Sequence, residues 1–296
     1  MSTSPLRPVF IVGGSRTGST MLQVILGKSR EVSLVDEMQF RTRAWLHRDL
    51  VTDIRKRVGS LQDPGALDRL MELLYSGIPE GWIWSEAERM LNRDMLREEL
   101  SKEPLTQQSI FDAILTTHAR MRGKQNKGAK FPVHYSYTQQ LLDWYPDCRL
   151  IHTTRDPKAV YASQANKYLS PDQNALARAF MRFKQFVHIN IQTSWTAHIH
   201  RKFCGLPNYR LVRYEDMVMD PEQEIRRICE FLEIEFVEGM LQPQRFGSSY
   251  KSAEQKNQGI DRSSLERWRS SISGFTAGVI DLLHPRALHI LGYRDD

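Results

Sequence analysis

The sequence predicts an α/β protein with a helical insertion, and three features support this prediction. Residues 9–12 are apolar and typical of a buried strand, and a glycine-rich turn and a helical pattern over residues 20–26 follow them. Residues 149–155 form a second strand-like run that leads directly into a helix, with Pro157 near the first helical position. Between these two units, at about residues 38–125, apolar residues recur mostly at helical spacing.

The composition is that of a globular protein with one large core. Of the 296 residues, 41% are hydrophobic and 26% are charged, so we expect a single domain over residues 1–296. The net charge of +6 suits an anionic cofactor or acceptor. Because the Lys and Arg residues are dispersed along the chain, we expect no nucleic-acid partner.

Cysteine usage and hydropathy set further expectations. Cys148, Cys204 and Cys229 are too few and too scattered for a disulfide framework or a zinc site. No apolar run reaches the length of a membrane span, and the first residues lack the apolar core of a signal peptide. We therefore expect a cytoplasmic protein without a transmembrane segment.

The turn after the first strand has the character of an anion-binding loop. Backbone N–H groups of such a turn, placed at a positive helix end, suit phosphate or sulfate. Gly13 and Gly18 occupy the glycine positions of a Walker A loop, but Ser19 stands where that loop carries its lysine. Arg16 and the hydroxyls of Ser19 and Thr20 favour a metal-free anion over a metal-bound triphosphate. The alternative is an ordinary glycine turn.

Two carboxylates follow the next strand, which we expect over residues 31–35. Asp36 and Glu37 lie at its carboxyl end, where ligands gather in open α/β sheets. These residues are therefore candidates for chemistry. The alternative is a pair of acidic residues at the start of a helix.

The insertion consists of helical patterns over residues 40–58, 67–75 and 109–121. Trp82 and Trp84 lie between the second and third patterns, and they line either an acceptor pocket or the core. Residues 123–128 are predicted to be a basic, solvated connection. Lys130 follows them and is expected at a strand end.

The second strand-to-helix unit carries a candidate site for a phosphate monoester. Arg155 ends the strand, Asp156 and Pro157 open the helix, and Ser163 and Lys167 lie one turn apart on it. Guanidinium, hydroxyl and ammonium groups are suitable donors to phosphate oxygens. The alternative is a surface Arg–Asp pair at a helix cap.

The rest of the chain adds a long helix, a strand and a loop. An amphipathic helix is predicted over residues 175–199, and its apolar face would consist of Phe180, Phe183, Val187, Ile191, Trp195 and Ile199. Its histidines lack the spacing of a metal site, and we expect no metal in this protein. A strand is predicted over residues 209–214 and a mobile loop over residues 247–259. Ser263 is expected to cap the next helix, with Glu266 completing a capping box.

Taken together, five motifs resemble those of sulfotransferases that use 3′-phosphoadenosine 5′-phosphosulfate (PAPS). The motif at residues 14–20 resembles the 5′-phosphosulfate loop of the family, and the one at residues 155–163 resembles its 3′-phosphate motif. Three shorter pieces also match in order: Lys130-Phe131-Pro132, Arg213-Tyr214-Glu215-Asp216 and Arg267-Trp268. The agreement in order and spacing extends over nearly the whole chain.

The resemblance implies a P-loop-like, three-layer α/β fold with a central parallel sheet and a helical insertion on the acceptor side. It also implies PAPS as cofactor, with PAP as its product, and these cofactor contacts: Ser15, Arg16, Thr17, Gly18, Ser19, Thr20, Arg155, Ser163, Lys167, Tyr214, Ser252 and Arg267. The chain departs from the family at Phe131, where a threonine is usual, and at Lys167, where some relatives carry arginine.

The same resemblance implies a catalytic set of Glu37, Lys130 and Arg16. Sulfuryl transfer needs a base for the acceptor hydroxyl and cations for the bridging oxygen. The acidic residue after the second strand places the chain nearer the tyrosylprotein and bacterial carbohydrate branches than the branch with a histidine base. Glu37 is the expected base, since Asp36 should face the other way along an extended chain, and His134 is its rival.

Two other functions compete with this hypothesis. One is a catalytically silent protein that binds a phosphoadenosine nucleotide, and the other is a P-loop phosphoryl-transfer enzyme, which the missing Walker lysine disfavours. The sequence leaves the hydroxyl-bearing acceptor open among a sugar, a lipid, a tyrosine and a small natural product. It also leaves the oligomeric state open.

Overall fold

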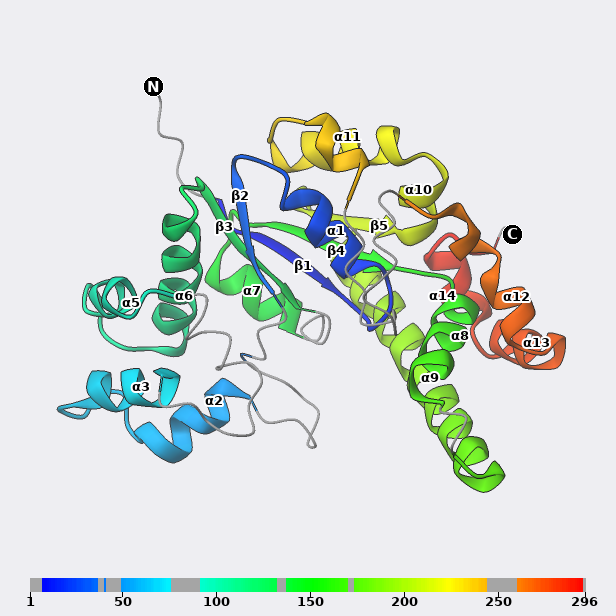
Figure 1. Ribbon diagram of the computed structural model, residues 1–296, viewed down its shortest axis with the longest axis horizontal. Coiled ribbons are helices and arrows are strands. Elements are labelled where there is room, and N and C mark those ends of the chain that lie inside the picture. Colours follow the sequence, from blue (N-terminus) through cyan, green and yellow to red (C-terminus); the bar gives the residue numbers. More distant parts are fainter. Residues whose placement is uncertain are drawn as a thin grey trace. The chain divides into compact units, whose positions relative to one another are not determined.

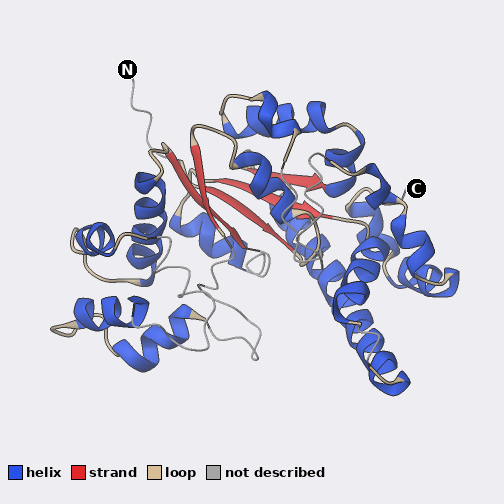
Figure 2. Cartoon of the chain, in the orientation of Figure 1, coloured by secondary structure: helices blue, strands red, loops and turns tan. Residues whose placement is uncertain are grey.

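The computed structural model describes residues 7–36, 40, 49–75, 91–131, 137–169, 173–243 and 260–294. The described residues contain a five-stranded sheet (Figure 2) made of β1 Val9–Gly13, β2 Val32–Val35, β3 Asn126–Phe131, β4 Arg149–Thr154 and β5 Tyr209–Arg213. The strand order is β2-β3-β1-β4-β5, and both β2–β3 and β4–β5 pair in parallel. The predicted α/β class with a parallel sheet is confirmed.

The helices alternate with these strands along the chain, as Figure 1 shows. They are α1 Ser19–Leu26, α2 Leu50–Asp53, α3 Ala66–Tyr75, α5 Arg93–Leu100, α6 Gln107–Met121, α7 Thr138–Trp144, α8 Pro157–Tyr168, α9 Ala175–Phe203, α10 Tyr214–Met219, α11 Pro221–Leu232, α12 Arg267–Ser271, α13 Gly274–Leu283 and α14 Pro285–Ile290. A π-helical turn at Ile54–Val58 and 3-10 turns at Glu238–Leu241 and Arg262–Leu265 complete the set. Among the described residues, no helix is both long enough and apolar enough to cross a membrane.

The chain divides into two compact units. Unit 1 consists of Met1–Phe10 and Arg30–Arg149, and unit 2 consists of Ile11–Ser29 and Leu150–Asp296. Strand β1 contributes its first residues to unit 1 and its last residues to unit 2. All five of its residues are buried, as its apolar sequence predicts.

Unit 1 contains the helical insertion between β2 and β3, which confirms that prediction for the described residues. Aromatic rings fill its core: Phe111 of α6 lies 6.0 Å from Phe10 of β1 and 4.8 Å from Phe40, measured between ring centroids. A capping box formed by Thr106 and Ser109 starts α6.

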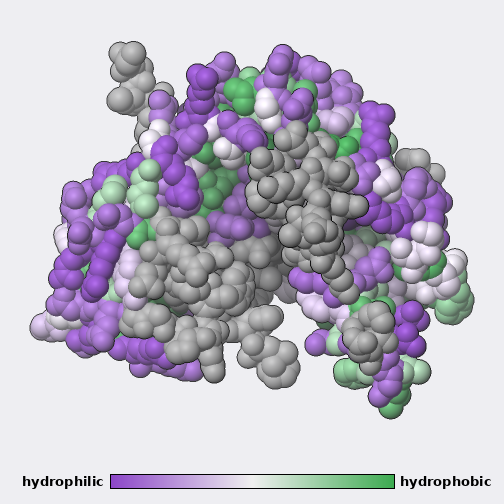
Figure 3. Space-filling view, in the orientation of Figure 1, coloured by the Kyte–Doolittle hydropathy of each residue, from purple (hydrophilic) through white to green (hydrophobic). Residues whose placement is uncertain are grey.

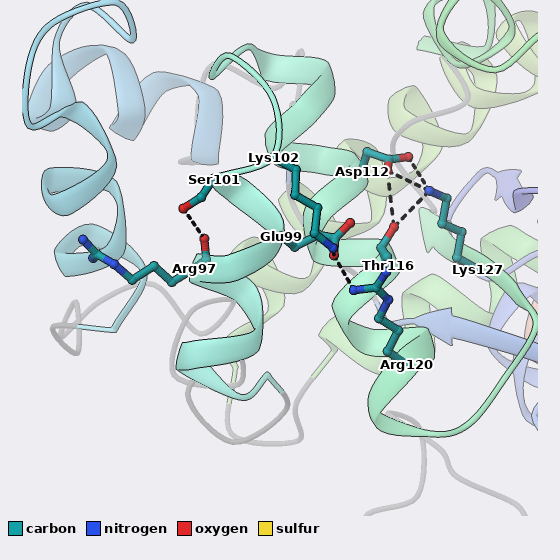
Figure 4. A network of polar contacts seen from close by, with 8 residues as sticks. All are labelled: Arg97, Glu99, Ser101, Lys102, Asp112, Thr116, Arg120 and Lys127. Atoms are coloured by element: carbon teal, nitrogen blue, oxygen red, sulfur yellow. Dashed lines mark hydrogen bonds and ion pairs between the residues drawn. The ribbon is translucent and has the colours of Figure 1, made fainter.

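Ion pairs join the helices of the insertion to one another and to the sheet (Figure 4). Glu99 of α5 pairs with Arg120 of α6 at 2.6 Å. Asp112, about two turns before Arg120 on α6, pairs with Lys127 of β3 at 2.6 Å. These contacts bind α5, α6 and β3 into one body within unit 1.

The prediction of a solvated connection at residues 123–128 is wrong for its second half. Strand β3 begins at Asn126, and Gly128 packs so closely on β1 that a Cβ atom there would lie 1.9 Å from the Val9 carbonyl oxygen. The Lys127 side chain does not extend into water, because it pairs with Asp112. Glycine and lysine are poor indicators of strand, so pairing with neighbouring strands decides the structure here.

Unit 2 contains α9, whose predicted apolar face is exposed except for one residue. Ile199 is buried, while the other five members of the predicted face lie open to solvent. The helix packs instead through its opposite side, whose buried members are Gln185, Ile189, Gln192, Thr193, Thr196, Ala197, Ile199 and Phe203. Ile189 joins Val160, Tyr161 and Ile280 in a core cluster. The predicted helix is confirmed, but the side that faces the core is different.

Candidate active site

The loop after β1 is built by a close approach between two strands of unit 2. Gly13 has a φ of +152°, and a Cβ atom there would lie 2.4 Å from the Thr153 hydroxyl oxygen of β4. Thr17 is buried, and its hydroxyl donates to the Gly14 carbonyl oxygen at 2.8 Å and bonds to the Thr153 hydroxyl at 2.8 Å. Only glycine fits at position 13, and the Thr17 side chain holds the loop rather than facing outward.

Gln192 of α9 holds the next peptide of this loop. Its Oε1 atom accepts a hydrogen bond from the Ser15 N–H, and its Nε2 atom donates to the Ser15 carbonyl oxygen, both at 3.1 Å. A Cβ atom on Gly14 would lie 2.2 Å from Cδ of this side chain. The sequence analysis missed Gln192, because nothing in its local pattern shows which side of α9 faces the sheet.

Arg16 joins the two motifs that the sequence analysis treated separately. It adopts a φ of +68°, and its Nε atom donates to the Ser163 hydroxyl of α8 at 2.9 Å. The expected 5′ cation and the expected 3′-phosphate hydroxyl are therefore direct neighbours. Lys167 follows Ser163 by one turn, and its ammonium lies 5.4 Å from the centre of the Tyr168 ring.

Helix α1 begins directly after this loop. Gly18 precedes it with a φ of +91°, and a Cβ atom there would lie 2.6 Å from the Tyr214 ring. Ser19 is buried and Thr20 half-buried in the first turn of the helix. The backbone N–H groups of this turn have no partners within the helix, which makes the turn a suitable binding site for an anion.

Arg155 is held against Tyr214 and Ser264. Its guanidinium lies 4.1 Å from the centre of the Tyr214 ring, and its Nη2 atom donates to the Ser264 carbonyl oxygen at 3.0 Å. The Tyr214 hydroxyl donates to the Ser264 hydroxyl at 2.7 Å. Within the described residues, the buried Nε atom of Arg155 has no hydrogen-bond partner and the side chain forms no ion pair. Glu215 interacts with Arg155 electrostatically, but no carboxylate of the described residues contacts the guanidinium directly.

The segment that carries Ser264 differs from its predicted form. Asp261, not Ser263, is the capping side chain: it accepts a hydrogen bond from the Ser263 N–H at 2.9 Å and starts a 3-10 turn. Arg267 donates to the Asp261 carboxylate at 2.7 Å and to the Ser263 hydroxyl at 2.9 Å. The predicted capping box is wrong, because the α-helix starts only at Arg267.

Glu215 connects the residue after Arg155 to the C-terminal segment. Its carboxylate accepts a hydrogen bond from the Asp156 N–H at 3.0 Å and another from the Tyr293 hydroxyl at 2.9 Å. Burial raises the pKa of Glu215 above its usual range, and it also raises the pKa of the Tyr293 hydroxyl. The role of Tyr293 could not be found in the sequence, since it lies almost 80 residues from its partner.

Unit 1 contains a second cation at a strand end. Lys130 is 1% exposed, and its Nζ atom lies 2.8 Å from a carboxylate oxygen of Asp36, whose side chain is 52% exposed. The parallel register explains the pair: Val35 of β2 lies opposite Ala129 of β3, so the next residue on each strand is also adjacent. Asp36 is thus the described carboxylate that contacts Lys130.

Several predicted residues lie outside the described residues. They are Glu37, His134, Ser252, Trp82 and Trp84, together with the loop predicted at residues 247–259. Their predicted roles stay predictions. Among the residues that the structure does describe, no group of three or more His, Cys, Asp or Glu side chains is placed to hold a metal ion.

The fold and the loop define an α/β protein with a glycine-rich turn between its first strand and first helix. A family model described as "Sulfotransferase family" matches residues 8–238, and the chain belongs to this family. This finding confirms the resemblance found in the sequence and the fold expected from it.

Individual relatives agree with the family. An uncharacterized protein of Aquifex aeolicus (strain VF5) is 26% identical over 283 residues, which cover 94% of this chain and 32% of that protein. Carbohydrate sulfotransferase 3 of Rattus norvegicus is 27% identical over 161 residues, which cover 50% of this chain and 34% of that protein. The chain spans about a third of the length of the curated relatives that it matches.

Solved structures share the fold. The sulfotransferase domain of the Synechococcus PCC 7002 olefin synthase matches with a TM-score of 0.59 at 20% identity, over 99% of this chain and 97% of that one. The sulfotransferase domain from the curacin biosynthetic pathway matches with a TM-score of 0.57 at 16% identity, over 99% and 100% of the two chains.

Proposed function

We propose that this protein transfers a sulfuryl group from PAPS to the hydroxyl of an acceptor. The observation that carries the proposal is that unit 2 holds two cations in the turns that follow its strands: Arg16, whose Nε atom donates to the Ser163 hydroxyl, and Arg155, which lies on the Tyr214 ring. PAPS carries two anionic groups on one nucleoside, and this chain offers a cation for each.

The residues of unit 2 fit this cofactor. The buried Nε atom of Arg155 has no hydrogen-bond partner among the described residues, and buried N–H groups are rarely left so. The glycines at positions 13, 14 and 18 remove side chains that would fill the turn. Residues 15–20 would hold the 5′ end, while Arg155, Ser163 and Lys167 would hold the 3′-phosphate. Tyr214 and Arg267 would support the second site.

The chain's own residues would then carry out proton transfer and charge stabilisation. When bound, PAPS supplies the sulfuryl group as an activated mixed anhydride. Glu37 accepts the proton of the acceptor hydroxyl as a general base. Arg16 and Lys130 offset the negative charge that develops on the bridging oxygen. Asp36 holds the Lys130 ammonium at its strand end and keeps that side chain in one orientation.

The acceptor is proposed only as a hydroxyl-bearing molecule. The name of carbohydrate sulfotransferase 3 supports a sugar, and a lipid, a tyrosine and a small natural product are kept as further candidates. The helical insertion of unit 1 is proposed to shape the acceptor site.

The test combines transfer with binding. Sulfate-labelled PAPS should label one member of a pooled acceptor library, and PAP should raise the melting temperature without added metal. A chain that binds PAP and labels no acceptor class would be a nucleotide-binding protein without activity. Stabilisation by ATP with magnesium, but not by PAP, would indicate a phosphoryl-transfer enzyme instead.

A further inference from the structure

Helix α9 carries a long apolar stripe that the rest of unit 2 leaves uncovered. We define the α9 stripe as Leu176, Phe180, Phe183, Val187, Ile191 and Trp195, whose exposed fractions lie between 37% and 80%. Its members follow one another at intervals of three or four positions, so they lie along one side of the helix. From first to last they span about 28 Å at the helical rise per residue.

The stripe lies opposite the side through which α9 packs. Gln192, which binds the Ser15 peptide, and Ile189, which lies in the core cluster, are on that packing side. The stripe therefore takes no part in holding the nucleotide loop. Figure 3 shows hydrophobic residues gathered over the projecting end of α9. Apolar side chains left open along a helix indicate an interaction surface.

The charge of α9 is entirely of one sign. The helix has five Arg and Lys residues and no Asp or Glu: Arg178, Arg182, Lys184, Arg201 and Lys202. Lys184 flanks the stripe. Arg201 and Lys202 lie on the same side of the helix as the stripe, nearer its C-terminus. None of these five forms an ion pair with an acidic residue of the described ranges. Their charge is therefore not neutralised by an ion pair with any described residue of unit 2.

We propose that the α9 stripe docks onto the surface of an anionic lipid membrane. An exposed helix with Phe, Leu and Trp on one side and basic residues around it is typical of segments that lie in the headgroup region. Each basic residue near an anionic surface adds about 1 kcal/mol of attraction. The aromatic rings enter the boundary between headgroups and acyl chains, and Lys184, Arg201 and Lys202 contact the headgroups.

Charge argues against a second copy as the occupant. A second copy of α9 would bring lysine and arginine against lysine and arginine, with no carboxylate on either helix to neutralise them. A layer of anionic lipid headgroups is a continuous negative surface, and it places anions beside Lys184, Arg201 and Lys202 on the side of the helix that carries the stripe.

The test is sedimentation of the purified protein with vesicles. We expect it to bind vesicles of phosphatidylcholine mixed with phosphatidylserine in equal parts, to bind pure phosphatidylcholine at least about tenfold less tightly, and to be released as salt is raised. Equal binding to both kinds of vesicle, or binding to neither, would overturn the proposal. The readout does not depend on sulfuryl transfer, so it is independent of the proposed function.

Two matched variants locate the surface. The double variant Phe180→Ser/Phe183→Ser should weaken binding to the mixed vesicles at least about tenfold, since each buried aromatic side chain contributes about 1.5–3 kcal/mol. The control is Phe275→Ser/Leu282→Ser on α13, where two apolar side chains are even more exposed, and it should bind as the parent does.

The same variants decide between occupants. If both variants lose the same affinity for the mixed vesicles, then binding is unspecific adhesion of apolar side chains, and the proposal is overturned. A parent chain that is dimeric by sedimentation velocity, and monomeric in the Phe180→Ser/Phe183→Ser variant, would make a second copy the occupant and would also overturn it. Because both positions are exposed, we expect unchanged circular dichroism and melting temperature in the two variants.

Discussion

Two cations at strand ends, Arg155 in unit 2 and Lys130 in unit 1, are held in opposite ways. Arg155 lies on the Tyr214 ring and donates to a carbonyl oxygen, and within the described residues it forms no ion pair. Lys130 is almost fully buried and pairs with the carboxylate of Asp36. The Arg155 guanidinium has no carboxylate in direct contact among the described residues, although Glu215 interacts with it electrostatically, whereas the Lys130 ammonium has a direct carboxylate partner. We therefore expect a ligand anion to gain more from Arg155 than from Lys130.

The largest expected effect separates the two carboxylates that follow β2 in the sequence, Asp36 and Glu37. Glu37→Gln removes a base while keeping the size of the side chain, so we expect turnover to fall by roughly 10²–10⁴-fold with PAP affinity unchanged. Initial rates at saturating PAPS and calorimetric titration with PAP measure the two quantities. If turnover stays near normal in this variant and falls in Asp36→Asn, then Asp36 is the base. If turnover stays near normal in both variants, His134→Ala is the next variant to test.

The next effect compares the two cations directly. Arg155→Ala should weaken PAP binding by about 10–100-fold, because charge-assisted hydrogen bonds contribute about 1.5–3 kcal/mol. Adenosine 5′-phosphosulfate, which lacks the 3′-phosphate, should lose much less affinity, and Lys130→Met should leave PAP binding within about threefold. If Arg155→Ala weakens the binding of both nucleotides equally, then Arg155 does not bind the 3′-phosphate.

A smaller effect concerns stability. Asp36→Asn removes the charge of Asp36 from its contact with the buried Lys130 ammonium, and it should lower the free energy of unfolding by about 1–2 kcal/mol, since half of the Asp36 side chain is exposed and screened. Urea denaturation measures this loss. The matched control is Glu222→Gln, which breaks an exposed pair with Arg226 on α11 and should cost at most about 0.5 kcal/mol. If both variants lose the same free energy of unfolding, then the burial of Lys130 does not strengthen its pair with Asp36.

The last prediction concerns the pH dependence of stability, and it uses one buried histidine in each unit. Burial lowers the pKa of His118, which bonds to Ser33, and of His152, which bonds to Tyr209, to about 3 from an ordinary value of 6.5. The unfolded chain therefore takes up protons first as pH falls. Stability should decrease from about pH 6.5 toward pH 3, by at most about 1.4 kcal/mol per pH unit for each histidine.

Denaturation at a series of pH values in this window tests the last prediction. His118→Gln and His152→Gln should each reduce the slope, even where they lower stability at neutral pH. An unchanged slope in both variants would show that other groups cause the acid sensitivity.

The residues of the candidate site that directly follow strands could be predicted from the sequence. The residues that hold them in place by hydrogen bonds from elsewhere in the chain could not. The turn at residues 13–20, Arg155 and the helix with Ser163 were found because glycine, proline and β-branched residues have strong local preferences. Gln192, Ser264 and Tyr293 could not be found, because their roles depend on contacts with residues far away in the chain. Local patterns do not report such contacts.

The fold shows the same limit on a larger scale. The periodicity of α9 correctly predicted a helix, but its apolar side faces solvent and a side rich in Gln and Thr faces the sheet. Polar side chains are buried there because they form specific hydrogen bonds, such as those of Gln192 with Ser15. A period of 3.6 residues identifies two sides of a helix and does not say which of them the protein covers.

The contact between Gln192 and the turn has an evolutionary consequence. Position 14 has no room for a methyl group while position 192 carries glutamine, so the two positions are constrained as a pair. In diverging descendants of this chain, alanine at position 14 should arise only together with a smaller residue at position 192, and the loss of the glutamine amide should be accompanied by a new partner for the Ser15 peptide. Selection on the turn after β1 therefore extends to a helix almost 180 residues further along the chain.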